Sequence, residues 1–241
     1  MSSIISHAMI FAAGLGSRMR PLTDHTPKPL LKAGGRCLID YHVDRFLDLG
    51  INNIVINVSH LGKQVIQHIK SNYSNHPTIH FSIEEIPQET AGGLRLAYDR
   101  GLFGNSSENT VLVINADIWI DGDFIPLITY YKQLPVNSVL LAMVANPIQH
   151  PKGDFCLASD GTLHTVPLED AVSTGTLTFS GIGFYPLSFI QEITPGISPL
   201  SKWLRGGMQK KQVYGYEWQY AWSDIGTPER LNELDTQLSK K

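Results

Sequence analysis

Glycines and cationic side chains follow one another closely in the string MIFAAGLGSRMRPLTDHTPKPLL, which begins at residue 9. The apolar run ends at Gly14, where bare backbone N–H groups can approach an anion. Arg18 adds a guanidinium whose paired donors match phosphate oxygens. Lys28 lies between Pro27 and Pro29, which restrict the backbone on both sides of it. This combination of groups suits a phosphate-binding loop, and a solvated basic loop is the alternative that these residues alone leave open.

Two other phosphate-binding motifs share glycines with this string, and the sequence matches neither. A dinucleotide fingerprint, G-x-G-x-x-G, needs a third glycine where Met19 stands, and it must open a helix, which Pro21 disfavours. A Walker A loop, G-x-x-x-x-G-K-[ST], is absent from the sequence. An NAD-binding oxidoreductase is therefore disfavoured.

Two aspartates are candidate metal ligands. Asp117 directly follows the most apolar segment, in VLVINADIW, and Asp224 lies between a predicted strand and a predicted helix, in AWSDIGTPERL. Either could be a turn or helix-capping residue. Transfer between phosphate groups needs divalent charge, however, and Mg²⁺ usually takes only one or two protein carboxylates. On these residues alone, both the capping role and a magnesium site stay open.

The composition bounds the class of protein. The chain has 241 residues, 42% of them apolar, which is enough for one core or for one core with a small lobe. A net charge of −3 argues against nucleic-acid or anionic-membrane partners. Cys37 and Cys156 form neither a disulfide framework nor a zinc pattern, and no segment resembles a signal peptide or membrane span. We therefore expect a cytoplasmic location.

The candidate residues need a scaffold, and the first half of the chain supplies alternating strands and helices. Apolar strands are expected in HAMIFAAG, NNIVINV, TIHFSI and NTVLVINAD. The first helix between them has Ile39, Val43 and Phe46 on one face. This order predicts an α/β fold with a doubly wound, mostly parallel, Rossmann-like sheet and ligand-binding loops at the carboxyl ends of its strands.

The second half of the chain does not continue this regular alternation of strands and helices. A hairpin is expected around Ser159-Asp160-Gly161, followed by strands in TLTFSGIGFY and VYGYEWQYAWSD and a last helix from Pro228. We expect one domain over residues 1–241, in which residues 146–241 complete the sheet and build a smaller lobe.

The opening string resembles the first motif of the sugar-1-phosphate nucleotidyltransferases, A-A-G-x-G-x-R-[ML]-x-P-L-T-x-x-x-P-K-P-L, at every fixed position. SDIGTPERL resembles the W-x-D-[IV]-G-T-P-E-x-L string of that family. The resemblance implies catalytic roles for Arg18 and Lys28 and a Mg²⁺ shared by Asp117 and Asp224. It implies that the triphosphate is held by Ala13, Gly14, Gly16, Ser17, Arg18 and Lys28.

Two further strings resemble the base and sugar pockets of the family. IPQETAGGLRLA resembles the loop near the nucleobase, which makes Gly92 a candidate for contact with the base, and Glu84 or Glu85 could accept a hydrogen bond from a base N–H. TFSGIGFY resembles the sugar-pocket strand, so residues 1–145 become the nucleotide-binding half and residues 146–241 the sugar-binding lobe. The candidates for binding the sugar phosphate are Asn115, Asp154, Glu169, Ser180 and Gly181.

The sequence departs from the family pattern at two places. Ala116 replaces the glycine of the family string NGD, which costs about 1 kcal/mol or more if that position needs a positive φ. Relatives that act on glucose 1-phosphate often have a lysine in an E-K-P-like string, where this chain has PLEDAV. Lys152 is a further candidate for the sugar phosphate.

The resemblance implies an enzyme that converts a nucleoside triphosphate and a sugar 1-phosphate into a nucleotide sugar and pyrophosphate. Its expected partners are these small molecules, with no nucleic acid and no membrane; the oligomeric state is left open. The strings HTPKPLL, PKGDFCL and TFSGIGFY resemble a small bacterial branch, and we favour uridylyl transfer to N-acetylmuramate α-1-phosphate, a step of peptidoglycan recycling. The alternatives are a mannose-1-phosphate guanylyltransferase, a glucose-1-phosphate uridylyl- or thymidylyltransferase, and a non-enzymatic regulatory subunit, which would be expected to lose Lys28, Asp117 or Asp224.

Overall fold

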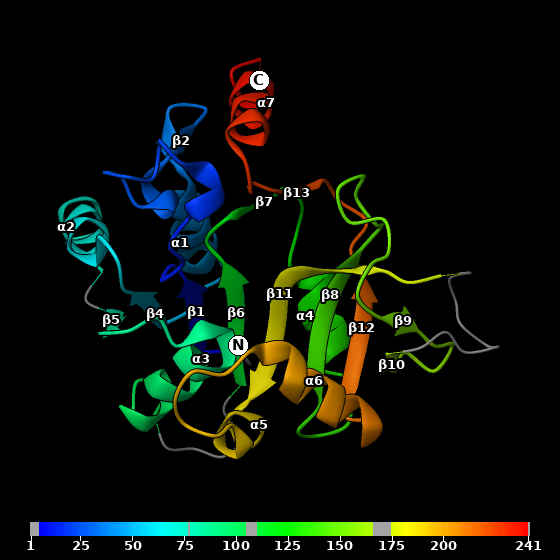
Figure 1. Ribbon diagram of the computed structural model, residues 1–241. Helices are drawn as coiled ribbons and strands as arrows, with labels where there is room; N and C mark the ends of the chain where they lie inside the picture. The colour runs from blue at the N-terminus through cyan, green and yellow to red at the C-terminus, as the bar shows by residue number, and fades with distance from the viewer. Residues whose placement is uncertain (1–4, 77, 105–109, 166–174, 241) are drawn as a thin grey trace.

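The computed structural model describes residues 5–76, 78–104, 110–165 and 175–240, and its centre is one mixed sheet (Figure 1). Within the described residues the sheet has seven strands. In spatial order they are β12 (Val213–Glu217), β8 (Val139–Val144), β11 (Thr178–Pro186), β6 (Thr110–Asn115), β1 (His7–Phe11), β4 (Asn53–Val58) and β5 (Ile79–Ile83).

All strands of this sheet except β11 run in one direction. β1 pairs in parallel with β4 and β6, β4 with β5, and β12 with β8, whereas β11 is antiparallel to both β6 and β8. The carboxyl ends of β1, β4 and β6 therefore meet at the upper edge of the sheet in Figure 1. The mostly parallel sheet predicted from the sequence is confirmed.

Helices cover both faces of the sheet, because its strands are apolar on both sides. Ala8 and Ile10 of β1 belong to one core cluster, while Met9 between them belongs to a second cluster on the opposite face. Figure 1 shows α3, α5 and α6 in front of the sheet and α1 and α4 behind it. The helices are α1 (Leu38–Asp48), α2 (Gly62–Asn72), α3 (Glu89–Asp99), α4 (Ile125–Tyr131), α5 (Leu187–Glu192), α6 (Leu200–Gln209) and α7 (Pro228–Leu238).

Short structures at the margins of the sheet complete the fold. The predicted hairpin is confirmed as β9 (Cys156–Leu157) and β10 (Leu163–His164). The first glycine loop contains the 3-10 turn η1 (Ser17–Met19), and the proline-rich segment contains η2 (Lys28–Leu30). A hairpin of β2 (Lys32–Ala33) and β3 (Arg36–Cys37) leads into α1. No helix within the described ranges is long and apolar enough to cross a bilayer.

The single strand predicted in VYGYEWQYAWSD is wrong, because the segment divides into two strands. β12 ends at Glu217, and β13 (Trp222–Asp224) pairs instead with β7 (Ile118–Ile120) above the main sheet. Between them, the Trp218 indole is buried edge-on against the Phe124 ring, with ring centroids 5.2 Å apart. The buried Trp218 therefore lies where the pairing with β8 ends, before the chain reaches β13. β11 and β12 complete the sheet, while the division into two halves at residue 145 stays a prediction.

The string ETAGG forms the first residues of α3, which begins at Glu89, so Gly92 and Gly93 lie inside a helix. A Cβ at Gly92 would lie 2.2 Å from the carbonyl oxygen of Gly196, so the missing side chain allows a close backbone approach. We expect Gly92→Ala to lower the free energy of unfolding by about 1–3 kcal/mol, although alanine is the better helix former.

Gly206 in α6 is the matched control for this substitution. A Cβ there would meet no atom within 4 Å, so Gly206→Ala should stabilise the protein by about 0.5–1 kcal/mol. Urea unfolding of both variants shows whether each substitution raises or lowers the free energy of unfolding. Equal effects of the two substitutions would contradict the packing role of Gly92.

Candidate active site

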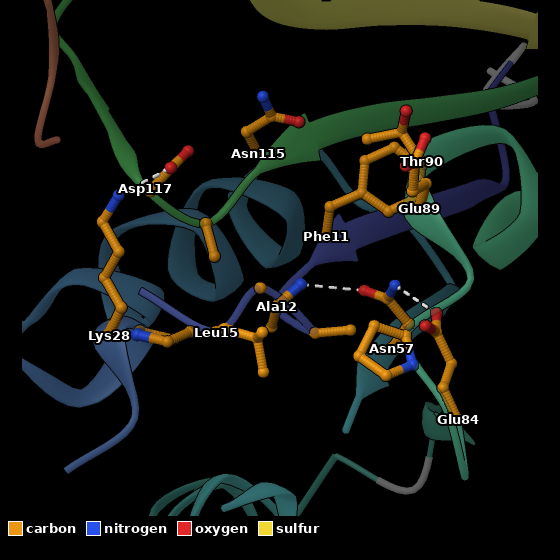
Figure 2. A pocket seen from close by; sticks show the side chains of 15 residues that line it. Phe11, Ala12, Leu15, Lys28, Asn57, Glu84, Glu89, Thr90, Asn115 and Asp117 are labelled. Atoms are coloured by element: carbon orange, nitrogen blue, oxygen red, sulfur yellow. Dashed lines mark hydrogen bonds and ion pairs between the residues drawn. The ribbon is translucent and has the colours of Figure 1, made fainter. Parts of the chain in front are cut away.

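Three hollows adjoin one another at the carboxyl edge of the sheet. The first has a volume of about 300 Å³ and includes Ala12, Lys28, Asn115 and Asp117 in its lining (Figure 2). A second hollow of about 170 Å³ shares Gly14, Lys28 and Asp117 with the first. A third of about 270 Å³ shares Phe11, Thr90 and Asn115 with it. Lys28 and Asp117 therefore join the first two hollows, and Asn115 joins the first to the third.

The glycine loop after β1 forms part of the second hollow, together with Ser17 and Arg18. Gly16 has a φ of +62°, and a Cβ there would lie 2.9 Å from Thr23 Cγ2, so this position requires glycine for both conformation and space. A Cβ at Gly14 would meet no protein atom within 4 Å. Since Gly14 faces two hollows, its bare backbone leaves room for a ligand.

Lys28 is held rigidly at the boundary between the first two hollows. The lysine opens η2, flanked by Pro27 and Pro29, and only 9% of its side chain is exposed. Its Nζ donates to Asp117 Oδ2 at 2.6 Å, and Figure 2 shows the lysine reaching across the cavity to that carboxylate. The Asp117 side chain is 41% exposed, so its carboxylate also faces the solvent-filled hollow.

The second aspartate is placed next to the first by a strand pairing that joins distant parts of the chain. Asp224 of β13 lies opposite Ile118 of β7, and the Ile225 N–H donates to the Asp117 carbonyl at 2.7 Å. The Asp224 carboxylate accepts hydrogen bonds from Arg230 of α7 and, at 2.7 Å, from Gln149 Nε2. The structure therefore brings together both aspartates that the sequence identified as metal ligands.

Arg18 lies at the same place. A Cβ at Gly226 would be 3.3 Å from Arg18 Nη1, 2.9 Å from Asp224 Oδ2 and 2.7 Å from Arg230 Nη2. Two guanidinium groups and a carboxylate thus surround bare glycine backbone, and Gly226 lines the same hollow as Arg18 and Lys28. Such a concentration of cationic groups beside carboxylates can bind a polyanion together with a divalent cation.

The β7 strand, which positions both aspartates, is held by α1 on its other side. The ring Nε2 of His42 lies 2.9 Å from the Ile118 carbonyl oxygen. Arg45 Nη2 and Nη1 donate to the carbonyl oxygens of Ile120 and Gly122 at 3.0 and 2.8 Å. Every second carbonyl group from Ile118 to Gly122 is therefore held by a side chain of α1, and the two side chains lie one helical turn apart.

His42 is neutral at the pH at which the protein is expected to work, and it donates to this carbonyl group as an uncharged ring. Burial, and secondarily the Arg45 cation, lower the pKa of His42 to about 4, so at neutral pH the uncharged ring donates from Nε2 to the carbonyl group. The unfolded chain protonates this imidazole below about pH 6.5. Because the unfolded state then binds more protons, His42 should reduce the stability of the fold as the pH falls from 6.5 to 4, by on the order of 3 kcal/mol.

His42→Gln tests this pH dependence, because glutamine retains an N–H donor and does not titrate. Urea unfolding at pH 7, 5.5 and 4.5 should show a smaller loss of stability in the variant than in the wild type. Parallel curves for the two proteins would show that the imidazole is not the titrating group.

At the opposite end of the first hollow, the Glu84 carboxylate connects Asn57 of β4 to the residue before α3. Asn57 Oδ1 accepts from the Ala12 N–H at 2.8 Å, and Asn57 Nδ2 donates to Glu84 Oε1 at 2.7 Å (Figure 2). The other carboxylate oxygen accepts from the Gln88 N–H at 2.8 Å. Burial raises the pKa of Glu84, and these hydrogen bonds oppose the rise. Glu84 therefore lines the hollow, with both of its oxygens already used to hold the end of β1 and the start of α3.

Gly92, the candidate for contact with the base, is not among the residues that line the three hollows. Gly92 packs against Gly196, whereas a Cβ at the next residue, Gly93, would lie 2.6 Å from Glu84 Oε1. Ala116 lines the first hollow, and it is absent from the four non-glycine residues with positive φ in the described ranges. The alanine that replaces the family glycine therefore does not need the positive φ that would strain it.

Three of the five predicted sugar-phosphate residues line the third hollow: Asn115, Asp154 and Gly181. Asp154 Oδ2 accepts from the Phe179 N–H at 2.8 Å, and Gly181 has a φ of +88°. Ser180 is buried instead, with its carbonyl oxygen accepting from Trp222 Nε1 at 2.9 Å. Glu169 lies outside the described residues.

Several lining residues were missed in the sequence. Asn57 is a polar residue near the end of the apolar strand β4, and that position at the ligand edge could have identified it. Arg230 lies within the string SDIGTPERL and could have been found with Asp224. Phe11 and Thr90, which join the first and third hollows, are ordinary strand and helix residues that no local pattern distinguishes.

Comparisons with known proteins identify the family of the chain and the fold that it shares with solved structures. The chain matches the nucleotidyl transferase family over residues 7–241. It is 39% identical to an N-acetylmuramate alpha-1-phosphate uridylyltransferase of Neisseria meningitidis serogroup B, over 94% of this chain and 95% of the relative, and 29% identical to one of Caulobacter vibrioides over the full length of both. A Bacillus anthracis crystal structure described as a glucose-1-phosphate thymidylyltransferase has the same fold, with a TM-score of 0.79 at 19% identity, covering 98% of this chain and 96% of that one.

Proposed function

Because the chain belongs to the nucleotidyl transferase family, we propose that this enzyme makes UDP-N-acetylmuramate and pyrophosphate from UTP and N-acetylmuramate α-1-phosphate. The observation that carries the reaction is the meeting of three hollows at Lys28, Asp117 and Asn115. Nucleoside, triphosphate and sugar phosphate can each occupy one hollow and still reach one another. The substrate assignment rests on the relative that is 39% identical along nearly the whole chain.

The proposed reaction needs positioning and charge neutralisation. An oxygen of the sugar phosphate attacks the α-phosphorus of UTP, a new oxygen–phosphorus bond forms, and the bond to the β-phosphate breaks to release pyrophosphate. The attacking oxygen is already an anion at neutral pH, so no proton is removed and no covalent intermediate forms on the protein. Arg18 and Lys28 hold the phosphate groups and neutralise the charge that develops between them.

Asp117 and Asp224 fit Mg²⁺ in this scheme. Both are carboxylates at least partly open to solvent, on paired strands beside the cationic groups, and Mg²⁺ needs only one or two such ligands when phosphate oxygens supply others. When bound, the ion would supply divalent charge against the repulsion of the two substrates. The same carboxylates pair with Lys28 and Arg230, which hold them in position without the ion.

The third hollow suits a sugar that has both apolar and acidic groups. Phe11, Phe179 and Tyr185 supply aromatic surface, and Asp154 and Asn115 supply polar groups for hydroxyl and amide recognition. The first residues of α6 also line this hollow, and the positive end of a helix favours a carboxylate such as the lactyl group of N-acetylmuramate. We place the reaction in the cytoplasm, where the free cysteines remain reduced.

A matrix of substrates tests the proposal. Pyrophosphate release is measured with UTP, GTP, dTTP or CTP against the 1-phosphates of N-acetylmuramate, N-acetylglucosamine, glucose and mannose. We expect the highest kcat/KM for UTP with N-acetylmuramate α-1-phosphate. A faster reaction with another pair would overturn the substrate assignment, and an absence of release with every pair would overturn the reaction itself.

A further inference from the structure

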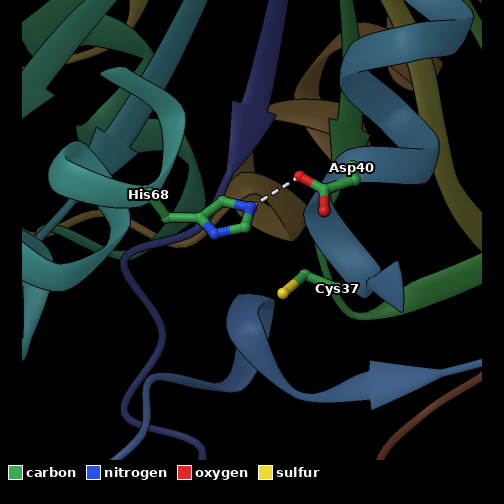
Figure 3. A group of neighbouring side chains, drawn as sticks. All are labelled: Cys37, Asp40 and His68. Atoms are coloured by element: carbon green, nitrogen blue, oxygen red, sulfur yellow. Dashed lines mark hydrogen bonds and ion pairs between the residues drawn. The ribbon is translucent and has the colours of Figure 1, made fainter. Parts of the chain in front are cut away.

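A second group of metal-binding side chains lies away from the three hollows. Cys37 ends β3, Asp40 lies in the first turn of α1, and His68 lies on α2; Figure 3 shows all three converging on one point. Within the described ranges, these residues form the one cluster of three such ligand types. We propose that Cys37, Asp40 and His68 bind a Zn²⁺ ion that links α1 to α2. This proposal is independent of the proposed function.

The distances suit zinc after small shifts, in which the His68–Asp40 pair separates slightly and the longer separations shorten. The three ligand atoms all lie within 4.8 Å of one another, and His68 Nε2 is 2.7 Å from Asp40 Oδ1. Ligand atoms around a tetrahedral Zn²⁺ lie about 3.3–3.6 Å apart, given Zn–S and Zn–N bonds of about 2.3 and 2.0 Å. Sulfur, imidazole nitrogen and carboxylate oxygen are the three ligand types that proteins use for zinc. A water molecule can then take the fourth position.

The burial of the cluster makes charge balance important. Cys37 is 5% exposed, and the side chains of Asp40 and His68 are 14% and 21% exposed. A thiolate and a carboxylate together neutralise a divalent ion, so the zinc-loaded site would carry no net charge in this partly buried place. Burial, and then the Asp40 carboxylate, raise the pKa of the Cys37 thiol. Zinc therefore has to displace the thiol proton, as it does in thiolate sites generally.

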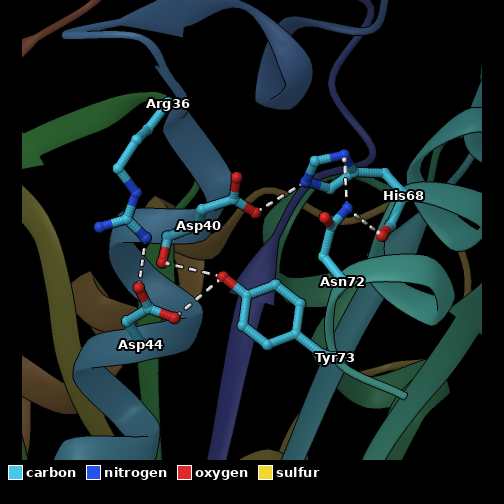
Figure 4. Close-up of polar contacts among 6 residues, drawn as sticks. All are labelled: Arg36, Asp40, Asp44, His68, Asn72 and Tyr73. Atoms are coloured by element: carbon cyan, nitrogen blue, oxygen red, sulfur yellow. Dashed lines mark hydrogen bonds and ion pairs between the residues drawn. The ribbon is translucent and has the colours of Figure 1, made fainter.

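The Arg36 guanidinium near Asp40 is bound to a different carboxylate, so it does not draw Asp40 away from Cys37 and His68. Figure 4 shows Arg36 bound to Asp44, which also accepts from Tyr73 Oη at 2.9 Å, so the nearby guanidinium is bound by the other aspartate. Asn72, one turn after His68 and exposed, places its Nδ2 3.3 Å from His68 Nδ1. With zinc on Nε2 the ring proton moves to Nδ1, and Asn72 can turn its amide oxygen to accept it.

The site would stabilise the segment that carries Lys28. The Leu38 N–H, beside Cys37, donates to the Leu31 carbonyl at 2.9 Å, directly after η2. From α2, Gln64 Nε2 donates to the His25 carbonyl at 3.0 Å. Zinc would join these two supports by a strong cross-link, so its removal should loosen α2 against the proline-rich loop.

Cobalt titration of the full chain tests the proposal, because Co²⁺ replaces Zn²⁺ and its thiolate complexes have a near-ultraviolet charge-transfer band. We expect one Co²⁺ per chain with this band, which added Zn²⁺ abolishes. Cys37→Ser should lose the band, and Asp40→Asn and His68→Gln should weaken Co²⁺ binding by at least about tenfold. Cys156→Ser, which removes the other buried thiol, and Asp224→Asn, in the proposed Mg²⁺ site, should retain it.

Thermal unfolding supplies a second readout. Zn²⁺ at about 100 times its Kd should raise the Tm of the wild type by about 5–10 °C and should leave the Tm of Cys37→Ser unchanged. The metal-free melt of each variant shows whether it folds. The proposal is overturned if the wild type gives no charge-transfer band with excess Co²⁺, if the band persists in Cys37→Ser, or if Zn²⁺ raises both melting temperatures equally.

Discussion

Asp117→Asn and Asp224→Asn should each abolish Mg²⁺-dependent pyrophosphate release, with kcat/KM lowered by at least about 10³-fold, equivalent to about 4 kcal/mol of transition-state stabilisation. Each change keeps the shape of the side chain and removes the charge that a hard divalent cation requires. The effect should be large at either position, because the pairing of β7 with β13 brings both aspartates next to the second hollow, which Arg18 and Lys28 also line.

The two variants should differ in stability. Asp117→Asn leaves the buried Lys28 ammonium without its anionic partner, 2.6 Å away, and a buried charge that loses its partner is costly. In Asp224→Asn, Arg230 keeps its hydrogen bond to the Asp224 carbonyl oxygen at 3.1 Å. We therefore expect a greater loss of unfolding free energy at Asp117.

Pyrophosphate release across a range of Mg²⁺ concentrations, with urea unfolding alongside, measures both effects. Asp99→Asn is the matched control, since Asp99 is an exposed carboxylate that pairs with Arg95 at 2.7 Å on α3. Its kcat/KM should stay at the wild-type value. Turnover within threefold of the wild type in either active-site variant would overturn the metal assignment.

Patterns within short stretches of the sequence were sufficient to predict much of the fold. The apolar runs of β1, β4 and β6 and the apolar face of α1 each depend on residues close together in the chain, and the structure confirms them. The pairing of β7 with β13 joins residues about a hundred positions apart, and three-residue strands have too little periodicity to be recognised. The sequence therefore predicted the sheet but missed the small ribbon that positions the two aspartates.

The same limit applies to individual site residues. The candidate phosphate loop could be proposed because Gly14, Gly16, Arg18 and Lys28 lie in one string. Gly92 and Gly93 are adjacent in the sequence, yet the helix turns their Cα atoms toward different neighbours. Gly93 lies against Glu84, which lines the first hollow, whereas Gly92 lies against Gly196. Which glycine approaches the site depends on the packing of α3 against distant segments, and no spacing within the string determines it.

Lys28→Ala should lower kcat by about 10²–10³-fold while changing the KM for the sugar phosphate much less. A lysine held between two prolines, with its Nζ fixed 2.6 Å from Asp117, is prepared to meet charge that develops during transfer. Stability should change little, because the Asp117 carboxylate left behind is 41% exposed and can be hydrated. This is the opposite of the Asp117→Asn result, although both variants break the same ion pair.

Lys28→Arg and Lys32→Ala complete the test, with kcat and KM measured by pyrophosphate release. Arginine retains the charge, but the buried stem and the short distance to Asp117 leave little room for a guanidinium, so kcat should remain low. Lys32, exposed in β2, controls for the general loss of one positive charge and should leave kcat unchanged. If Lys28→Ala raised KM alone, with kcat at the wild-type value, the lysine would contribute equally to substrate and transition-state binding, and its catalytic assignment would be wrong.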